Sequence, residues 1–170
     1  QANIPLTTSD NANLKVILNG PWQSYKIIGS LELHEQIIHF KGAGSLDNIN
    51  INSEKKSPFK MNATIDWKDH WSWRLNVMGN IPSNILDDDI NFDISSKGKI
   101  NDFQINIKDL TMPLDEKNLK IKANVRAKDQ DISGNATLFY GKNKATINGN
   151  ITDTIDIDGT INLRDLSELS

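Results

Sequence analysis

The stretch KATINGNITDTIDIDGTINL, residues 144–163, decides the fold because its apolar and polar residues alternate almost without interruption. From Ala145 onward every odd position is apolar or glycine except Asp153, and every even position is polar. Successive side chains of a β-strand point to opposite faces of a sheet, so this pattern predicts strands with one apolar and one polar face. The apolar face then meets either a second sheet or something that is not protein.

The same alternation recurs along the rest of the chain. FKMNATIDW, residues 59–67, and WSWRLNV, residues 71–77, each place their apolar side chains on one face. The short link KDH, residues 68–70, predicts a β-hairpin whose two apolar faces lie on the same side. Further strands are predicted in the opening stretch and at 14–19, 26–33, 36–42, 46–52, 89–95, 103–108, 119–128 and 131–140.

Turn residues separate these predicted strands, as in Asn19-Gly20-Pro21 and Gly141-Lys142-Asn143. Their short and regular spacing is typical of a long antiparallel meander. The best helix candidate is IPSNILDDD, residues 81–89, and it has room only for a short helix. The sequence therefore predicts an all-β protein.

Composition limits the possible functions. A formal net charge of -3 gives no electrostatic attraction to nucleic acid or to an anionic membrane. The absence of cysteine excludes disulfides, thiol catalysis and cysteine-ligated zinc. No apolar run approaches the ~20 residues of a membrane-spanning helix, and no signal peptide is visible. We expect a piece of a longer protein, with 1–13 as a poorly defined N-terminal extension and 14–170 as a single all-β repeat segment.

Two architectures fit the pattern. In a closed β-sandwich the meander folds over so that two apolar faces meet. In an elongated, curled antiparallel sheet the apolar faces instead line one continuous groove. Glycines fall on inward positions at 29, 134, 149 and 159, where they add no packing volume and leave space or let a sheet bend. These glycines favour the elongated sheet.

No catalytic, metal or cofactor site is predicted, and we expect a protein that is not an enzyme. His39 lies five positions after His34, and an odd offset on a regular strand places the two side chains on opposite faces. Asp87, Asp88 and Asp89 lack the alternating spacing of a calcium loop, and no serine lies in a G-x-S-x-G motif. Asn62 and Asn135 match glycosylation acceptors, but both face outward on apparent strands.

The tryptophans allow two interpretations. Trp67, Trp71 and Trp73, with Trp22 earlier in the chain, could form a platform for stacking sugars. However, the three clustered tryptophans share the apolar face of the predicted hairpin with Met61 and Leu75. A role in a core or in the lining of a groove is therefore preferred.

Three phrases of the sequence resemble the periplasmic repeats of the TamB family, within the AsmA-like group. They are A-x-x-x-W-x-x-x-x-x-W-x-L at 63–75, G-x-N-x-A-T-I-N-G-x-I at 141–151 and I-D-G-T-I-N-L-R-D-L-S at 157–167. The resemblance covers most of residues 55–170 and is looser over 14–52. It implies a long, U-shaped and partly open β structure with an apolar interior groove.

The resemblance also implies a function. Members of the family bridge the inner and outer membranes of Gram-negative bacteria across the periplasm, anchored in the inner membrane, and support outer-membrane biogenesis. The segment is thus expected to conduct phospholipid without catalysis. The alternatives are a scaffold that assists assembly of outer-membrane β-barrel proteins such as autotransporters, or a closed-core interaction domain. The barrel protein TamA partners the family, although we do not expect this segment to contact it.

One set of residues is predicted to line the groove for acyl chains, because its alternation keeps the same phase from strand to strand. An exposed groove of this kind would also favour self-association of the chain. The set is Phe59, Met61, Ile65, Trp67, Trp71, Trp73, Leu75, Val77, Leu119, Ile121, Val125, Leu138, Ile147, Ile151, Ile155, Ile157, Ile161 and Leu163.

Overall fold

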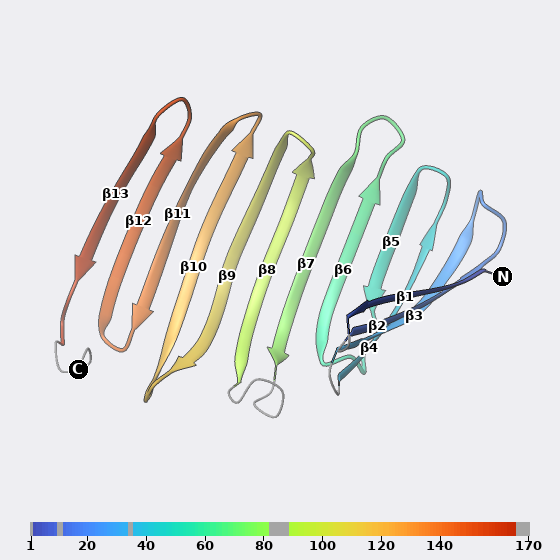
Figure 1. Cartoon of the computed structure of the whole chain (residues 1–170), viewed down its shortest axis with the longest axis horizontal. Coiled ribbons are helices and arrows are strands. Elements are labelled where there is room, and N and C mark those ends of the chain that lie inside the picture. The colour runs from blue at the N-terminus through green and yellow to red at the C-terminus, as the bar shows by residue number, and fades with distance from the viewer. Residues whose placement is uncertain (1, 10–11, 34–35, 82–88, 166–170) are drawn as a thin grey trace.

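The structure is a computed structural model that describes residues 2–9, 12–33, 36–81 and 89–165 (Figure 1). These residues form one antiparallel sheet of thirteen strands, arranged side by side in sequence order. The strands are β1 Ala2–Ser9, β2 Ala12–Asn19, β3 Tyr25–Leu33, β4 Gln36–Gly44, β5 Asn48–Ser53, β6 Phe59–Asp66, β7 Ser72–Ile81, β8 Ile90–Lys99, β9 Asp102–Leu114, β10 Lys117–Lys128, β11 Asp131–Tyr140, β12 Asn143–Ile151 and β13 Ile155–Asn162.

The sheet is elongated and open, so the predicted curled antiparallel sheet is confirmed and the closed sandwich is wrong. β1 and β13 are its two edges, and Figure 1 shows them at opposite ends of the molecule. The first four strands run across the direction of the later ones, which curls the N-terminal end. Residues 2–9, within the predicted N-terminal extension, form β1 and pair with β2. The helix candidate at 81–89 lies almost wholly outside the described residues.

The register aligns apolar residues of every strand from β2 to β13. Directly paired residues of antiparallel strands share a face, so a single row of pairs can be followed across the sheet. Ser96 is the one polar member of this row. The row is Leu18, Ile27, Gly42, Ile51, Ala63, Leu75, Ser96, Ile105, Val125, Gly134, Gly149 and Ile157. We call the side of the sheet that carries this row the apolar face, and the other side the polar face.

A β-bulge in β9 keeps the apolar face continuous. Ile107 pairs with Ala123 and Leu110 pairs with Ile121, so Lys108 and Asp109 together oppose Lys122. The extra residue shifts the phase of the alternation by one position and returns Leu110 to the apolar face. The predicted strand stopped at residue 108, because the alternation breaks there, whereas β9 continues to Leu114.

The apolar face is buried at one end of the sheet and exposed at the other. Ile38 in β4 is 1% exposed and Ile27 in β3 is 2% exposed. Ile155 and Ile161 in β13 are each 73% exposed. The compact part of the core therefore lies in the curled N-terminal end, and the apolar face opens to solvent toward β13.

The glycines expected on inward positions do lie on the apolar face, but they serve two purposes. Gly29 pairs with Phe40, and a Cβ on Gly29 would lie 2.3 Å from that ring. Gly29 is therefore needed because Phe40 fills its space. Around Gly149 and Gly159 the nearest atoms to a built Cβ are 3.7 Å and 3.6 Å away, so these two positions leave open surface.

Candidate functional site on the apolar face

The residues predicted to line a groove are brought onto one surface by the register. All of them except Trp67, Trp71 and Leu163 lie on strands, and all those on strands belong to the apolar face. Ile65 pairs with Trp73, for example, and Ile151 pairs with Ile155. Their role as a lining for a ligand stays a prediction.

Trp67 and Trp71 do not lie on strands as the sequence analysis placed them. They belong to the link between β6 and β7, where their ring centroids are 6.0 Å apart. The Trp67 indole donates a hydrogen bond to the carbonyl of Leu46, and its backbone N–H donates to the carbonyl of Asp47. These two bonds hold the end of the hairpin against the loop that precedes β5. Both tryptophans flank the predicted link at 68–70 and continue the phase of their apolar runs, which is why the sequence analysis assigned them to the strands.

Sequence reasoning missed the part of the apolar face that joins β7 to β10. The paired residues of β8 and β9 complete the surface there, with Val77 opposite Ile94 and Ile94 opposite Ile107. Both strands were predicted, and the alternation of residues 89–95 and 103–108 carried the signal. The missed residues are Phe92, Ile94, Phe103, Ile105, Ile107, Leu110 and Met112.

The exposed section of the apolar face spans β11 to β13, and aliphatic side chains dominate it. We call this section the C-terminal patch. It lies where Gly149 and Gly159 leave the backbone uncovered between isoleucines. Its exposed large residues are Ile132, Ile147, Ile151, Ile155, Ile157, Ile161 and Leu163.

Polar atoms on the apolar face have partners. The Trp73 indole N–H donates a 2.9 Å hydrogen bond to the Ser96 hydroxyl, so the serine that interrupts the apolar row is satisfied. No buried side-chain nitrogen or oxygen among the described residues lacks a hydrogen-bond partner. An apolar ligand on this face would therefore meet no strong polar anchor.

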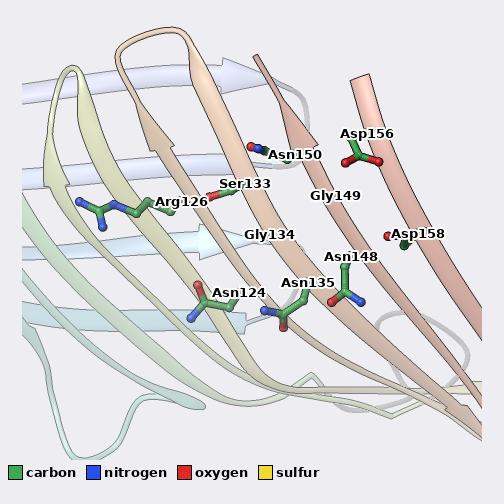
Figure 2. Close-up of a pocket in the computed structure, with 10 residues that line it drawn as sticks. All are labelled: Asn124, Arg126, Ser133, Gly134, Asn135, Asn148, Gly149, Asn150, Asp156 and Asp158. Atoms are coloured by element: carbon green, nitrogen blue, oxygen red, sulfur yellow. The ribbon is translucent and has the colours of Figure 1, made fainter. Parts of the chain in front are cut away.

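The polar face carries rows of carboxamides. One row runs through β5, β6 and β7 as Asn52, Asn62 and Asn76, and Asn62 donates its side-chain N–H to Asn52. The same row continues through β10 to β12 and ends at Asp158 on β13. Figure 2 shows this end of the row, where a hollow of about 470 Å³ is lined by asparagines, Arg126 and two aspartates.

Cross-strand ion pairs hold the middle of the polar face. Lys120 Nζ lies 3.1 Å from the Asp109 carboxylate, and Arg126 lies 3.4 Å from Asp102. Partial burial acts to raise the pKa of Asp109, but hydrogen bonds from Thr111 and Lys120 outweigh it and hold that pKa below its ordinary value. All these groups are partly exposed, so each pair contributes little to stability.

The remaining candidates for chemistry are dispersed. His39 is exposed and pairs with Ser30 on the polar face, whereas His34, Asp87 and Asp88 lie outside the described residues. Among the residues that the structure describes, no three histidines, aspartates or glutamates cluster as metal ligands would. Asn62 and Asn135 both lie on the polar face, as expected from the sequence.

Comparisons of the chain with protein-family models, with curated proteins and with solved structures find no match. The resemblance to the TamB family accordingly stays a prediction from the quoted phrases. In the described ranges there is also no helix long and apolar enough to cross a membrane.

Proposed function

We propose that the protein is a non-enzymatic conduit segment whose apolar face carries the acyl chains of phospholipid. One observation carries the proposal: an apolar face that runs through strands β2 to β13 of a single open sheet and reaches solvent at the C-terminal patch. Each directly paired position continues the surface from one strand to the next. A tail could therefore move along the sheet without leaving apolar contact.

The energetics support transport of lipid tails. Each exposed methylene costs about 0.8 kcal/mol in water, so a tail of about 15 methylenes faces roughly 12 kcal/mol on leaving a bilayer. Contact with isoleucine, leucine and valine side chains removes much of that cost. Because the buried polar side-chain atoms of the described residues are already paired, a tail would slide along this face, while the headgroup stays in water.

The exposure gradient suits the C-terminal patch as the place where a tail enters or leaves. Ile155 and Ile161 at β13 are open to solvent, and the glycines between the isoleucines leave room for methylenes. The resemblance to the TamB family fits this proposal. It would place the segment in the periplasm, within an inner-membrane-anchored bridge to the outer membrane.

A second candidate function is a scaffold that shelters strands of outer-membrane β-barrel proteins. The exposed isoleucines of the C-terminal patch favour it, because they offer apolar surface to one side of an incoming strand. Both functions use the same end of the sheet, but they differ in what is bound: a lipid tail or a polypeptide.

Photo-crosslinking in cells tests the lipid proposal. A photoreactive amino acid replaces Ile155 in the natural protein that contains this segment, and the attached species are identified by mass spectrometry. Asp156 is the neighbouring control, and Ile28 is a second control, because this isoleucine is 54% exposed on the polar face. Phospholipid captured at 155 and at neither control is the expected result.

Two other outcomes would overturn the proposal. Capture of phospholipid at all three positions would show unspecific contact with a membrane. Capture of only the protein's own chain at 155 would show that the C-terminal patch is covered by protein and is an ordinary core.

A further inference from the structure

Two cations face each other on inner strands of the polar face. Arg74 on β7 is directly paired with Lys97 on β8, and both side chains are exposed. We call these two residues the facing cations. Among the directly paired positions of the described sheet, this is the one at which both residues are basic. Like charges directly opposite each other destabilise a strand pair, so this position costs the fold some stability.

The facing cations line a hollow of the polar face that has an excess of positive charge. Its volume is about 750 Å³, and Lys99 and Arg126 also line it. Its two carboxylates are those of Asp66 and Asp102, which leaves an excess of two positive charges. Because the whole chain carries a formal net charge of -3, this hollow reverses the charge of the protein locally.

Both carboxylates of the hollow have other partners. Asp102 lies 3.4 Å from the Arg126 guanidinium. Asp66 accepts a 3.1 Å hydrogen bond from the backbone N–H of Lys68, in the link after β6. Within the described ranges neither of the facing cations forms an ion pair. Their charges are therefore available to an anion from solution.

Uncharged hydrogen-bonding groups surround the facing cations. Thr64 on β6 pairs with Arg74, and Gln104 on β9 pairs with Lys97, so the same row continues with polar side chains on both sides. A second hollow, of about 240 Å³, lies beside the facing cations, and Asn76 and Ser95 are among the residues that line it. Hydroxyl and carboxamide groups can donate hydrogen bonds to an oxyanion, and no carboxylate lines this second hollow.

We propose that the facing cations bind the phosphate group of a phosphate monoester. Directly opposite Cβ atoms lie about 4.5–5.5 Å apart, so both long side chains reach one anion between them. The guanidinium of Arg74 offers two parallel N–H donors to phosphate oxygens, and the ammonium of Lys97 adds a point charge. A bound anion also removes the repulsion between the two strands.

The charge of the ligand favours a monoester. A phosphate monoester carries a charge of about −1.5 to −2 at neutral pH, which matches two cations, whereas a carboxylate or a phosphate diester carries a single charge. The site lies on the opposite side of the sheet from the apolar face, so it does not rest on the proposed binding of lipid tails. A soluble ester and a lipid with a monoester headgroup offer the same oxygens, and the experiment distinguishes these two sources.

A nuclear magnetic resonance titration of the full chain with glycerol 3-phosphate, at constant ionic strength, tests binding of a soluble ester. We expect saturable shifts centred on residues 74 and 97, with half-saturation at about 1–10 mM, since a few exposed charge contacts supply the affinity. The Arg74→Gln, Lys97→Gln double variant should bind about tenfold more weakly, because each exposed charge contact contributes roughly a two- to fivefold factor.

A matched double variant controls for the loss of charge. Lys15→Gln, Lys41→Gln removes two cations from β2 and β4 on the same face, where each stands opposite uncharged residues. It should bind as the unaltered chain does. All four substituted side chains are exposed, so the variants retain the fold, and far-UV circular dichroism checks this.

Vesicle sedimentation tests the lipid source. Phosphatidic acid presents a phosphate monoester, and phosphatidylglycerol presents a diester, each mixed into phosphatidylcholine at equal total charge. Saturable binding of glycerol 3-phosphate assigns the site to soluble esters. Binding that is stronger to phosphatidic acid vesicles, lost in the Arg74→Gln, Lys97→Gln variant and absent with glycerol 3-phosphate, assigns it to a lipid headgroup.

Unfolding in urea gives an independent measurement. Without phosphate, Lys97→Gln should raise the unfolding midpoint at low salt, because it removes the repulsion from Arg74. Glycerol 3-phosphate should then raise the midpoint of the unaltered chain more than that of the double variant, since a ligand stabilises the state that binds it.

Four results would overturn the proposal. They are equal binding by the Arg74→Gln, Lys97→Gln variant, shifts centred away from β7 and β8, equal shifts produced by acetate at the same ionic strength, and the absence of binding to both the soluble ester and phosphatidic acid vesicles.

Discussion

Asp93 on β8 lies directly opposite Asp109 on β9, so two carboxylates face each other across a strand pair. The repulsion between them is tolerated because each carboxylate has its own lysine. Lys108 Nζ lies 3.8 Å from the Asp93 carboxylate, and Lys120 Nζ lies 3.1 Å from the Asp109 carboxylate. The Thr111 hydroxyl also donates a 2.8 Å hydrogen bond to Asp109. The β9 bulge therefore brings two carboxylates and two lysines together at one point of the polar face.

Replacing Lys120 by methionine should weaken the fold at neutral pH and leave it almost unchanged in acid. The pKa of Asp109 is lowered in the folded state despite partial burial. A lowered carboxyl pKa contributes stability that is present above the unfolded value of about 3.9 and is lost as the pH falls through the folded value. Because both side chains are more than a third exposed, we expect a loss below about 1 kcal/mol.

Urea unfolding of both proteins at pH 7 and at pH 2.5 measures this difference. The matched control is Lys60→Met, since Lys60 lies on the same face opposite Met78 and forms no ion pair among the described residues. An equal loss of stability at the two pH values would show that Lys120 acts through the packing of its methylenes and not through the Asp109 charge.

Glycine 29 should tolerate no larger side chain, whereas Gly149 should accept alanine. A Cβ on Gly29 would lie 2.3 Å from the Phe40 ring and 2.6 Å from the backbone oxygen of Lys15, and the backbone cannot move away easily. We expect Gly29→Ala to destabilise the protein by about 1–3 kcal/mol. Gly149→Ala meets nothing closer than 3.7 Å, so we expect a change within about 0.5 kcal/mol, measured by thermal unfolding. Equal effects of the two substitutions would show that Phe40 does not fill the space at Gly29.

Most of the fold could be predicted from the sequence because one physical signal, alternation with a period of two, specifies strands, faces and register together. KATINGNITDTIDIDGTINL folds into β12 and β13 with the expected apolar positions paired. The end of β9 escaped prediction because a bulge shifts the phase between Ile107 and Leu110 without any glycine or proline to mark it. A stretch of sequence in which the apolar and polar alternation shifts by one position could be interpreted as a single strand with a bulge.

The exposure of the candidate site could not be predicted in the same way. Ile38 and Ile155 occupy equivalent positions in the alternation, yet one is buried and the other is open. The difference depends on how strongly the sheet curls over each position, and this curl arises from contacts among many strands. The alternation therefore predicts which residues form the apolar face, but it does not predict which of them are exposed.

This contrast predicts opposite outcomes for two chemically identical substitutions. Ile38→Asp places an unpaired charge in a site that is 1% exposed, so we expect a loss of at least about 3 kcal/mol or failure to fold. Ile155→Asp places the same charge at a site that is 73% exposed, so the fold should remain and the unfolding midpoint should hardly change. Circular dichroism and urea unfolding measure both. Comparable destabilisation by the two substitutions would mean that the C-terminal patch is covered in solution.

Asn143 should control whether the segment after β13 stays attached to the sheet. This side chain is 5% exposed, donates a 2.9 Å hydrogen bond to the Asp165 carbonyl, and accepts bonds from the backbone N–H groups of Arg164 and Asp165 at 2.8 Å and 3.1 Å. Alanine at 143 removes all three bonds at once, so we expect faster hydrogen exchange at 164 and 165 and a loss of about 1–3 kcal/mol in local stability. Asn148→Ala on the same strand is the control, because Asn148 is exposed on the polar face. If exchange at 164 and 165 were unchanged in the Asn143 variant, the ion pair between Lys142 and Asp165, at 3.2 Å, would be the contact that holds the segment.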